Sequence, residues 1–274
     1  MTHLTTLTTM PPRSHGTLHI VAKTRDKGVS ALADLHQKGS AKILMTPALD
    51  AVEGIILNTS GGLTGGDTLA ISATAQEGAR LRLTTQAAER VYRTPDDRPA
   101  RVRNTLTIRS GGRIDWLPQE TILFQNGSLR RSLTLDMAAD ARALIVEPVL
   151  FGRLAMGETI THAALFDSLS IKRGGTLLFK DATHLTGDVA ARMDKPAIGN
   201  GARAMALVVF AGPEAESHLD PLRAMLPPNA GVSRVRDGLL VLRVLAPDGF
   251  ELRRSLIPIL ERLSGDALPR SWRL

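Results

Sequence analysis

Several acidic residues of this 274-residue chain lie in or beside apolar or glycine-rich segments, where an ionised carboxylate needs a partner. They are Asp67, Glu89, Asp115, Glu120, Glu147, Glu158 and Asp181. Carboxylates in such places can act as a pair of catalytic acids or line a polar interior passage. They can also form salt bridges to nearby arginines such as Arg90, Arg93 and Arg153. The residue types alone leave these three interpretations open.

Ligands for a tightly bound transition metal are sparse. The chain contains no cysteine, which excludes disulfides, zinc–thiolate sites and cysteine nucleophiles. Two of its seven histidines, His15 and His19, are four residues apart, but the segment around them predicts a strand, in which they would not converge. We therefore expect no permanently bound metal or cofactor.

The glycine-rich segment 61–67 does not match a phosphate-binding loop. Its sequence, GGLTGGD, has no Lys followed by Ser or Thr after the last glycine, and Asp67 would repel an anion. A serine-hydrolase elbow is also absent, because Val235 stands where the motif around Ser233 needs glycine. We expect the glycines to allow a tight or closely packed backbone path between strands.

Hydrophobic residues make up 43% of the chain and charged residues 22%, a composition typical of a soluble globular domain with a sizeable core. The formal net charge is +7, but the basic residues are spread along the chain and aromatic residues make up only 3%. A nucleic-acid surface usually combines a dense basic stripe with aromatic residues. We therefore expect an acidic protein partner and no nucleic acid.

The sequence also argues against a membrane partner. The longest charge-free apolar stretch, 204–213, is too short to span a bilayer. Residues 1–12 contain no basic cluster followed by an apolar run, so we expect no secretory signal. These observations favour a cytoplasmic location.

The elements that must position the acidic residues are mostly strands. Leucine and isoleucine alternate with polar residues in the segments 81–83, 106–108, 129–135 and 169–171. This period of two is typical of a strand with one buried face. Turn signals bracket these segments, and no helical period appears before about residue 190, apart from a possible short turn at 86–92. We predict a flexible tail at 1–14 and a β body over about 15–190, whose short strands suit stacked or coiled sheets.

The last third of the chain changes character. We predict a buried strand at 204–211, a helix at 214–226, a hairpin turn at Asp237-Gly238, a strand at 239–245, and a helix at 250–263 that Pro258 should kink. These elements form an α+β segment over about 200–265, before a C-terminal tail. The predicted fold is one mainly β domain at 15–274 with about two helices.

Five motifs occur in order along the chain. They are GGLTGGD at 61–67, TTQAAERVYR at 84–93, WLPQE at 116–120 with Phe124, GRLAMGE at 152–158 and PRSW at 269–272. They resemble the GG-x-x-GGD, TTQAA-x-[KR]-x-Y, WLP-x-x, GR-x-x-x-GE and PR-x-W elements of the urease accessory protein family UreD, also called UreH. Each motif alone is weak, but five in the family's order are specific and span nearly the whole chain.

The resemblance implies a mainly β fold of coiled, helicoid-like sheets and a non-enzymatic role in urease maturation. Members of the family form a complex with UreF and the GTPase UreG and dock on apo-urease, and nickel is expected to pass through an internal tunnel toward the urease active site. The family's acidic tunnel positions correspond here to Asp67, Glu89, Glu147 and Asp181, and Glu158 is added from the GR-x-x-x-GE motif. Nickel would be in transit only, because separated carboxylates bind a divalent cation weakly enough to release it.

Other motif residues are expected to serve structure or partner docking. They are Gly61, Gly62, Gly65, Gly66, Arg90, Tyr92, Arg93, Trp116, Arg153 and Trp272.

Two alternative functions remain. A β-rich carbohydrate-active enzyme would use paired carboxylates such as Asp115 and Glu120, although few aromatic residues are available to stack on sugars. A structural binding module would act as a scaffold with no metal involvement.

Overall fold

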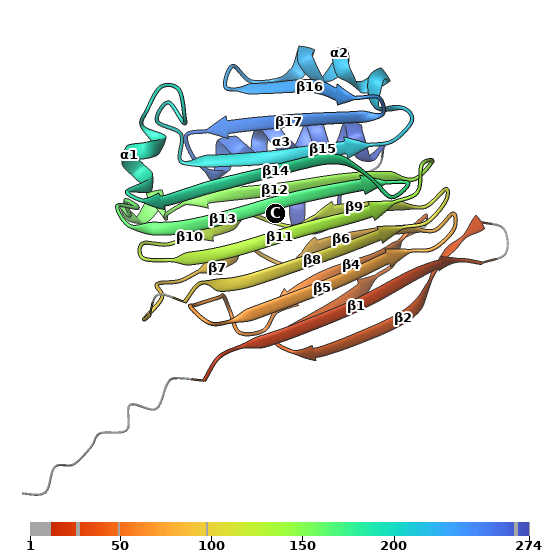
Figure 1. Cartoon of the computed structure of the whole chain (residues 1–274), viewed down its shortest axis with the longest axis horizontal. Coiled ribbons are helices and arrows are strands. Elements are labelled where there is room, and N and C mark those ends of the chain that lie inside the picture. Colours follow the sequence, from red (N-terminus) through yellow and green to blue (C-terminus); the bar gives the residue numbers. More distant parts are fainter. Residues whose placement is uncertain (1–11, 26–27, 49, 97, 266–267, 274) are drawn as a thin grey trace, which may run out of the picture.

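The structure is a computed structural model that describes residues 12–25, 28–48, 50–96, 98–265 and 268–273 (Figure 1). Most of the tail predicted at 1–14 lies outside the described residues. Ser14 is already part of the fold, because its carbonyl oxygen accepts a hydrogen bond of 2.9 Å from the backbone N–H of Thr68.

Seventeen strands of the described residues form two sheets. The seven-stranded sheet has the order β14 (Thr176–Gly187), β13 (Ala163–Arg173), β11 (Ser128–Met137), β8 (Ala100–Ile108), β5 (Thr68–Ala75), β1 (His15–Thr24) and β2 (Ser30–Gly39). The ten-stranded sheet has the order β16 (Ala230–Arg236), β17 (Leu239–Ala246), β15 (Ala204–Ala211), β12 (Arg142–Phe151), β9 (Arg113–Leu117), β6 (Arg80–Thr85), β4 (Val52–Asn58) and β3 (Ala41–Thr46). The short strands β10 (Thr121–Leu123) and β7 (Glu89–Val91) continue it beside β12.

Between β4 and β13 the chain winds back and forth between the two sheets. The strands β4, β6, β9 and β12 pair in parallel in one sheet, and β5, β8, β11 and β13 pair in parallel in the other. Antiparallel strands close the ends of the coil, with β2 beside β1, β14 beside β13 and β15 beside β12. The prediction of a mainly β fold with stacked, coiled sheets is confirmed.

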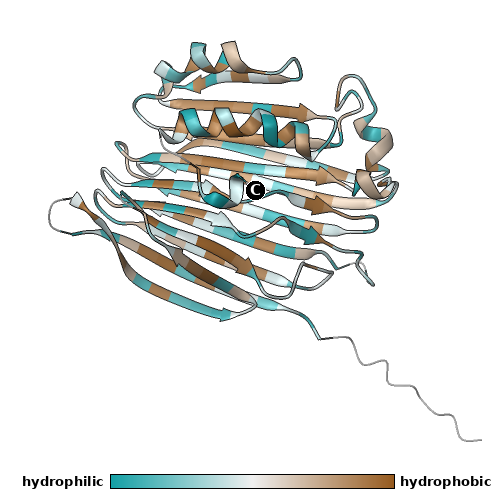
Figure 2. Cartoon of the chain, turned by 180° about the vertical axis from the view of Figure 1, so that it is seen from behind, coloured by the Kyte–Doolittle hydropathy of each residue, from teal (hydrophilic) through white to brown (hydrophobic). Residues whose placement is uncertain are grey.

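The centre of the ten-stranded sheet is buried on both faces. In β12, Ala143, Ile145 and Val149 belong to the core between the sheets, whereas Leu144 and Val146 belong to a second core under the helices. A strand buried on both faces has a near-continuous apolar sequence, and from Ala143 to Phe151 β12 follows this rule except at Glu147. Figure 2 shows α2 (Ala215–Met225) and α3 (Gly249–Ser264) on the side of the ten-stranded sheet that faces away from the seven-stranded sheet.

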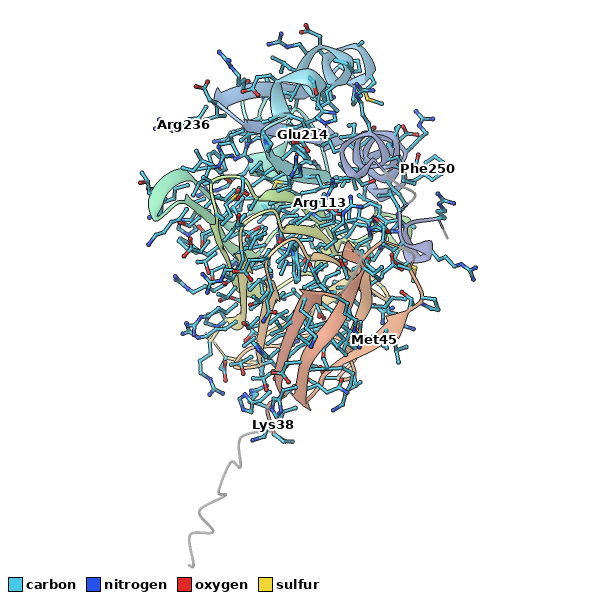
Figure 3. All side chains as sticks on the ribbon, turned by 90° about the vertical axis from the view of Figure 1, so that its right-hand side faces the viewer. Lys38, Met45, Arg113, Glu214, Arg236 and Phe250 are labelled. Carbon is cyan, nitrogen blue, oxygen red and sulfur yellow. The ribbon has the colours of Figure 1, made fainter. Side chains whose placement is uncertain are left out.

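Local signals explain the helices of the α+β segment. The Asp248 side chain caps α3 by accepting a hydrogen bond of 2.8 Å from the Glu251 N–H, and Gly265 ends the helix with a φ of 70°. Arg113 of β9 donates to the last carbonyl groups of α3, those of Leu263 and Ser264, and lies beside this helix in Figure 3. The end of α3 is therefore tied directly to the sheet.

The predicted helices at 214–226 and 250–263 are confirmed, and α3 continues through Pro258 as one helix. A third helix, α1 (Val189–Met193), was not predicted, because five residues are too short to show a period. The possible helical turn at 86–92 is wrong. Residues 89–91 form β7 instead, because β10 pairs with them in parallel and this pairing outweighs the local preference.

Within the described residues, every helix is too short or too polar to cross a bilayer.

Candidate functional site

Two cavities lie between the inner faces of the two sheets. Cavity 1 has a volume of about 370 Å³, with walls that include β4, β5, β8 and β11. Cavity 2 has a volume of about 520 Å³, with walls that include β13, β14, β15 and β17. Glu147 of β12 lines both cavities, so they adjoin at one buried carboxylate.

Each cavity extends to exposed loop residues. The lining of cavity 1 includes Gly61 and Gln86, from the loops that follow β4 and β6. The lining of cavity 2 includes Pro196 and Asn229, from the loops that precede β15 and β16. The two cavities thus reach the surface through different loops.

Three charged side chains form a junction cluster where the cavities adjoin: Arg131, Glu147 and Asp167. Arg131 Nη1 lies 2.6 Å from Glu147 Oε2, and Arg131 Nη2 lies 2.5 Å from Asp167 Oδ2. Arg131 Nε also donates to Asp167 Oδ1 at 3.0 Å. The other oxygen of Glu147, Oε1, accepts a hydrogen bond of 2.9 Å from Trp116 Nε1.

The charges of the junction cluster do not balance. One guanidinium faces two carboxylates, which leaves one excess negative charge when both acids are ionised. Burial raises the pKa of Glu147 to about 7; Arg131 and the Trp116 hydrogen bond oppose this shift, whereas the charge of Asp167 adds to it. Near neutral pH, Glu147 is therefore present in both its protonated and its ionised form.

The strand pattern explains how the cluster forms. Arg131 lies on the buried face of β11 between Leu129 and Leu133, and the parallel register places it directly beside Asp167 of β13. The sequence analysis did not single out Arg131 or Asp167. The available signal was a charged residue at a buried position of a period-two apolar stripe.

Strand β8 also has a polar side chain, the amide of Asn104, at a buried position of its apolar stripe. Asn104 interrupts the buried stripe of Val102 and Leu106, lines cavity 1, and is only 3% exposed. Its Oδ1 atom is buried without a hydrogen-bond donor from the described part of the chain. The cavity wall therefore offers a free oxygen acceptor, which the sequence analysis also missed.

Glu89 lies in the wall of cavity 1, near its exposed loops. Asn58 Nδ2 lies 3.2 Å from each of its carboxylate oxygens and donates to them. Burial raises the pKa of Glu89 to about 7, the Asn58 hydrogen bond lowers it, and the nearby charge of Asp67 contributes a small further rise.

Asp67 organises the glycine-rich loop and is not among the residues that line the cavities. Its carboxylate accepts hydrogen bonds of 2.8 Å from the backbone N–H groups of Ser14 and Thr64. Close packing explains two of the glycines in this loop. A Cβ atom on Gly62 would lie 2.3 Å from the Tyr92 ring, and one on Gly65 would lie 1.8 Å from a side-chain atom of Thr94.

Asp181 of β14 lies in the wall of cavity 2. Its carboxylate accepts a short hydrogen bond of 2.5 Å from Nη2 of Arg243, which also lines this cavity. The structure therefore brings Glu89, Glu147 and Asp181 to one interior that runs through two adjoining cavities.

Glu158 lies elsewhere, in a surface cluster. It pairs with Arg153 at 3.0 Å, and the Arg153 guanidinium lies 4.5 Å from the centre of the Phe124 ring. Tyr92 packs edge-on against Phe124 and donates a hydrogen bond of 3.2 Å to the carbonyl oxygen of Gly61. These four side chains thus meet at the surface and line neither cavity, although Gly61 of the same neighbourhood lies in the wall of cavity 1.

Two further arginines and two tryptophans of the motifs lie in different parts of the structure. Arg90 is exposed and contributes to the wall of cavity 1, and Arg93 is exposed in the neighbouring loop. Trp116 holds Glu147 as described above. Trp272 is completely buried under the helices and donates a hydrogen bond of 2.9 Å to the carbonyl oxygen of Leu117.

Asp115 and Glu120 are both paired with arginines. Arg113 Nε donates to Asp115 at 2.8 Å, and Arg253 of α3 donates to Glu120 at 2.8 and 3.1 Å. Neither acid lines cavity 1 or cavity 2. The Arg253–Glu120 pair joins α3 to the segment that follows β9. The Arg113–Asp115 pair lies within β9, and Arg113 contacts α3 through its hydrogen bonds to backbone carbonyl groups.

The interior offers oxygen donors but no assembled metal centre. Among the described residues, no three His, Asp or Glu side chains are grouped closely enough to hold a metal ion. A single carboxylate is a weak ligand for a divalent cation, and Glu89, Glu147 and Asp181 belong to no such group among the described residues. The arrangement suits successive, reversible contacts with a cation more than its permanent storage.

Comparison with known proteins agrees with the motifs. The sequence model of the family described as "UreD urease accessory protein" matches residues 14–273. The chain is 45% identical over 263 residues to a urease accessory protein UreD of Roseobacter denitrificans, a match that covers 96% of each chain.

Two further relatives carry the same name. The Ruegeria pomeroyi protein is 48% identical over 244 residues, which covers 89% of this chain and 95% of the relative. The Rhizobium leguminosarum bv. viciae protein is 40% identical over 268 residues, which covers 97% of each chain. The family match spans nearly the whole fold, and the chain therefore belongs to the UreD urease accessory protein family.

Proposed function

We propose that this protein is a urease maturation factor that docks on apo-urease with UreF and UreG and passes nickel toward the urease active site through its interior. Family membership supports the role in urease maturation. The observation that carries the passage is the position of Glu147, a buried carboxylate in the walls of two adjoining cavities.

The proposed route runs from Glu89 through Glu147 to Asp181. Glu89 lies near the loops of cavity 1, Glu147 adjoins both cavities, and Asp181 lies in the wall of cavity 2. A cation that meets one carboxylate at a time is stabilised at each step without a complete ligand shell, so it can leave again. Either direction of travel along this route fits the geometry.

Protons take part in the proposed transfer. Burial raises the pKa values of both Glu89 and Glu147 to about 7, so each side chain is part-protonated near neutral pH. An arriving divalent cation displaces the proton, and the proton returns when the cation moves on. This exchange avoids leaving an uncompensated charge in the interior.

Asp67 and Glu158 enter the proposal differently. Asp67 holds the loop next to Glu89 and influences the route through that position. Glu158 belongs to the surface cluster of Arg153, Phe124 and Tyr92, which is a candidate partner contact. Direct nickel contacts at Asp67 and Glu158 stay predictions, as do a cytoplasmic location and the absence of a permanent cofactor.

Co-expression of apo-urease with its accessory proteins tests the proposal. Urease activity should require this chain, and Glu89→Gln or Glu147→Gln should lower it about tenfold or more while the chain still co-purifies with its partners. The exposed residue Glu77 provides a matched control, so Glu77→Gln should leave activity unchanged. Full activation without the chain would refute a role in maturation. Full activation with both interior variants would refute the route and leave docking alone.

The carbohydrate-active alternative gains no support from the geometry. A glycosidase needs two carboxylates facing a shared cleft, whereas Asp115 and Glu120 are engaged by arginines under the helical segment. The scaffold alternative is decided by the same co-expression experiment, because a pure scaffold tolerates the interior variants.

A further inference from the structure

The Arg131 guanidinium uses separate nitrogen atoms for its two acidic neighbours. Nε and Nη2 bind Asp167 in a two-point contact, at 3.0 and 2.5 Å. Nη1 alone points toward Glu147 and also donates to Thr121 Oγ1 at 3.0 Å. One planar cation thus lies among oxygen atoms from three strands, β10, β12 and β13.

Without this guanidinium, the same oxygen atoms would form a cation site. Glu147 and Asp167 would offer two carboxylates and Thr121 a hydroxyl group, each of which lies within 3.0 Å of a nitrogen atom of the Arg131 guanidinium. Divalent cations bind such oxygen sets, and two carboxylates bind them far more tightly than one. The buried position, with side chains only 6% exposed for Arg131 and Glu147, would strengthen the attraction further.

We propose that Arg131 prevents the junction cluster from retaining a divalent cation, because its tethered guanidinium occupies the position that the cation would take. The inference rests on the proposed passage of nickel through this interior. A nickel ion at Glu147 competes with Nη1 and is repelled by the guanidinium, so its stay is short. The two-point contact with Asp167 keeps Arg131 in place while Nη1 releases Glu147.

Equilibrium dialysis of the full-length chain against nickel chloride tests this proposal. Arg131→Gln should bind nickel at least about tenfold more tightly than the wild type, because two carboxylates are freed for one ion. Arg131→Lys keeps the positive charge and is the matched control, so it should not gain affinity. The double variant Arg131→Gln/Glu147→Gln should lose the gain. Equal nickel affinity for Arg131→Gln and the wild type would overturn the proposal, as would an undiminished gain in the double variant.

Two further measurements cover the case in which Arg131→Gln folds poorly. Nickel should raise the melting temperature of Arg131→Gln more than that of the wild type, because a ligand that binds only the folded state stabilises it. Asp167→Asn leaves the guanidinium beside Glu147 and should gain no nickel affinity. A gain in Asp167→Asn as large as that in Arg131→Gln would contradict competition by the guanidinium.

The dialysis experiment is independent of urease activation. If Glu147→Gln activates urease fully while Arg131→Gln still gains nickel affinity, the passage is refuted and the competition at the junction cluster stands. If activation depends on Glu147 but Arg131→Gln gains nothing, the passage stands and the role of Arg131 is refuted.

Discussion

The two faces of the ten-stranded sheet carry similar charged residues in opposite arrangements. Under the helices, Asp115 is bound by Arg113 of its own strand, β9, and Glu120 by Arg253 of α3, and neither acid lines cavity 1 or cavity 2. Between the sheets, Glu147 and Asp167 share a single arginine and line open space.

This difference separates structural from functional charges. A balanced ion pair in a packed core holds two elements in register, and any cation would have to displace an arginine without compensation. Two carboxylates that share one arginine keep a residual negative charge, and a cavity beside them leaves room for an ion. Buried acids therefore point to function here only where the local charge is uncompensated and space is available.

The largest expected effect is a loss of folding stability when a charged residue under the helices is replaced. We call this face of the ten-stranded sheet the helix side. Arg113→Met should lower the free energy of unfolding by about 3–5 kcal/mol, because it leaves Asp115 buried without that guanidinium and frees the end of α3. Urea denaturation measures the change. The exposed pair of Arg223 and Asp220 supplies the control, since Arg223→Met should cost less than about 1 kcal/mol. Equal losses in the two variants would remove the structural role of the helix-side charges.

A smaller effect is the pH dependence of folding stability caused by the buried acids between the two sheets. We call this face of the ten-stranded sheet the cavity side. The pKa of Glu89 is raised from 4.5 to about 7 in the folded chain, so between these values the folded state holds a proton that the unfolded state has lost. Folding stability should therefore fall as pH rises from about 4.5 to about 7, and then level off. The contribution is on the order of 1–3 kcal/mol.

Glu89→Gln should reduce this loss, because glutamine does not titrate and can still accept a hydrogen bond from Asn58. Urea denaturation at pH 5 and pH 8 measures the difference, with Glu77→Gln as the control. Glu147 shifts in the same direction, so a variant at both interior positions should show the flattest profile. An unchanged pH profile in Glu89→Gln would contradict a raised pKa at this position.

The smallest effect is expected in the surface cluster. Arg153→Ala removes an ion pair to Glu158 in which the arginine side chain is 46% exposed, so solvent screens the pair and the free energy of unfolding should change very little. Any loss of urease activation should follow a matching loss of partner binding in a pull-down. Lower activation with full partner binding would assign Arg153 to the nickel route instead.

The sequence predicted the longer strands and helices of the fold. Alternation at 129–135 indicated a strand with one buried face, and β11 has that face in the core. The predicted helices at 214–226 and 250–263 were visible because they are long and amphipathic. The short α1 and β7 were missed or misassigned, because three to five residues depend on their tertiary neighbours.

The sequence predicted only some of the residues that form the candidate site. Glu89, Glu147 and Asp181 were predicted from motif resemblance, and the structure places them in the walls of adjoining cavities. Arg131 and Asp167 were not identified, although each interrupts a buried apolar stripe. Their contact depends on the parallel register of two strands that are separated by β12, and a single sequence does not give that register.

The nickel content of matured urease tests the central claim most directly. Glu147 and Glu120 are matched for this purpose, since both are acids about 5–6% exposed, both pair with an arginine, and they belong to the cavity side and the helix side respectively. Complexes that contain equal amounts of the chain should yield urease with about tenfold less nickel for Glu147→Gln, and with a nickel content within about twofold of the wild type for Glu120→Gln. Equal nickel content in the two variants would contradict a route between the sheets.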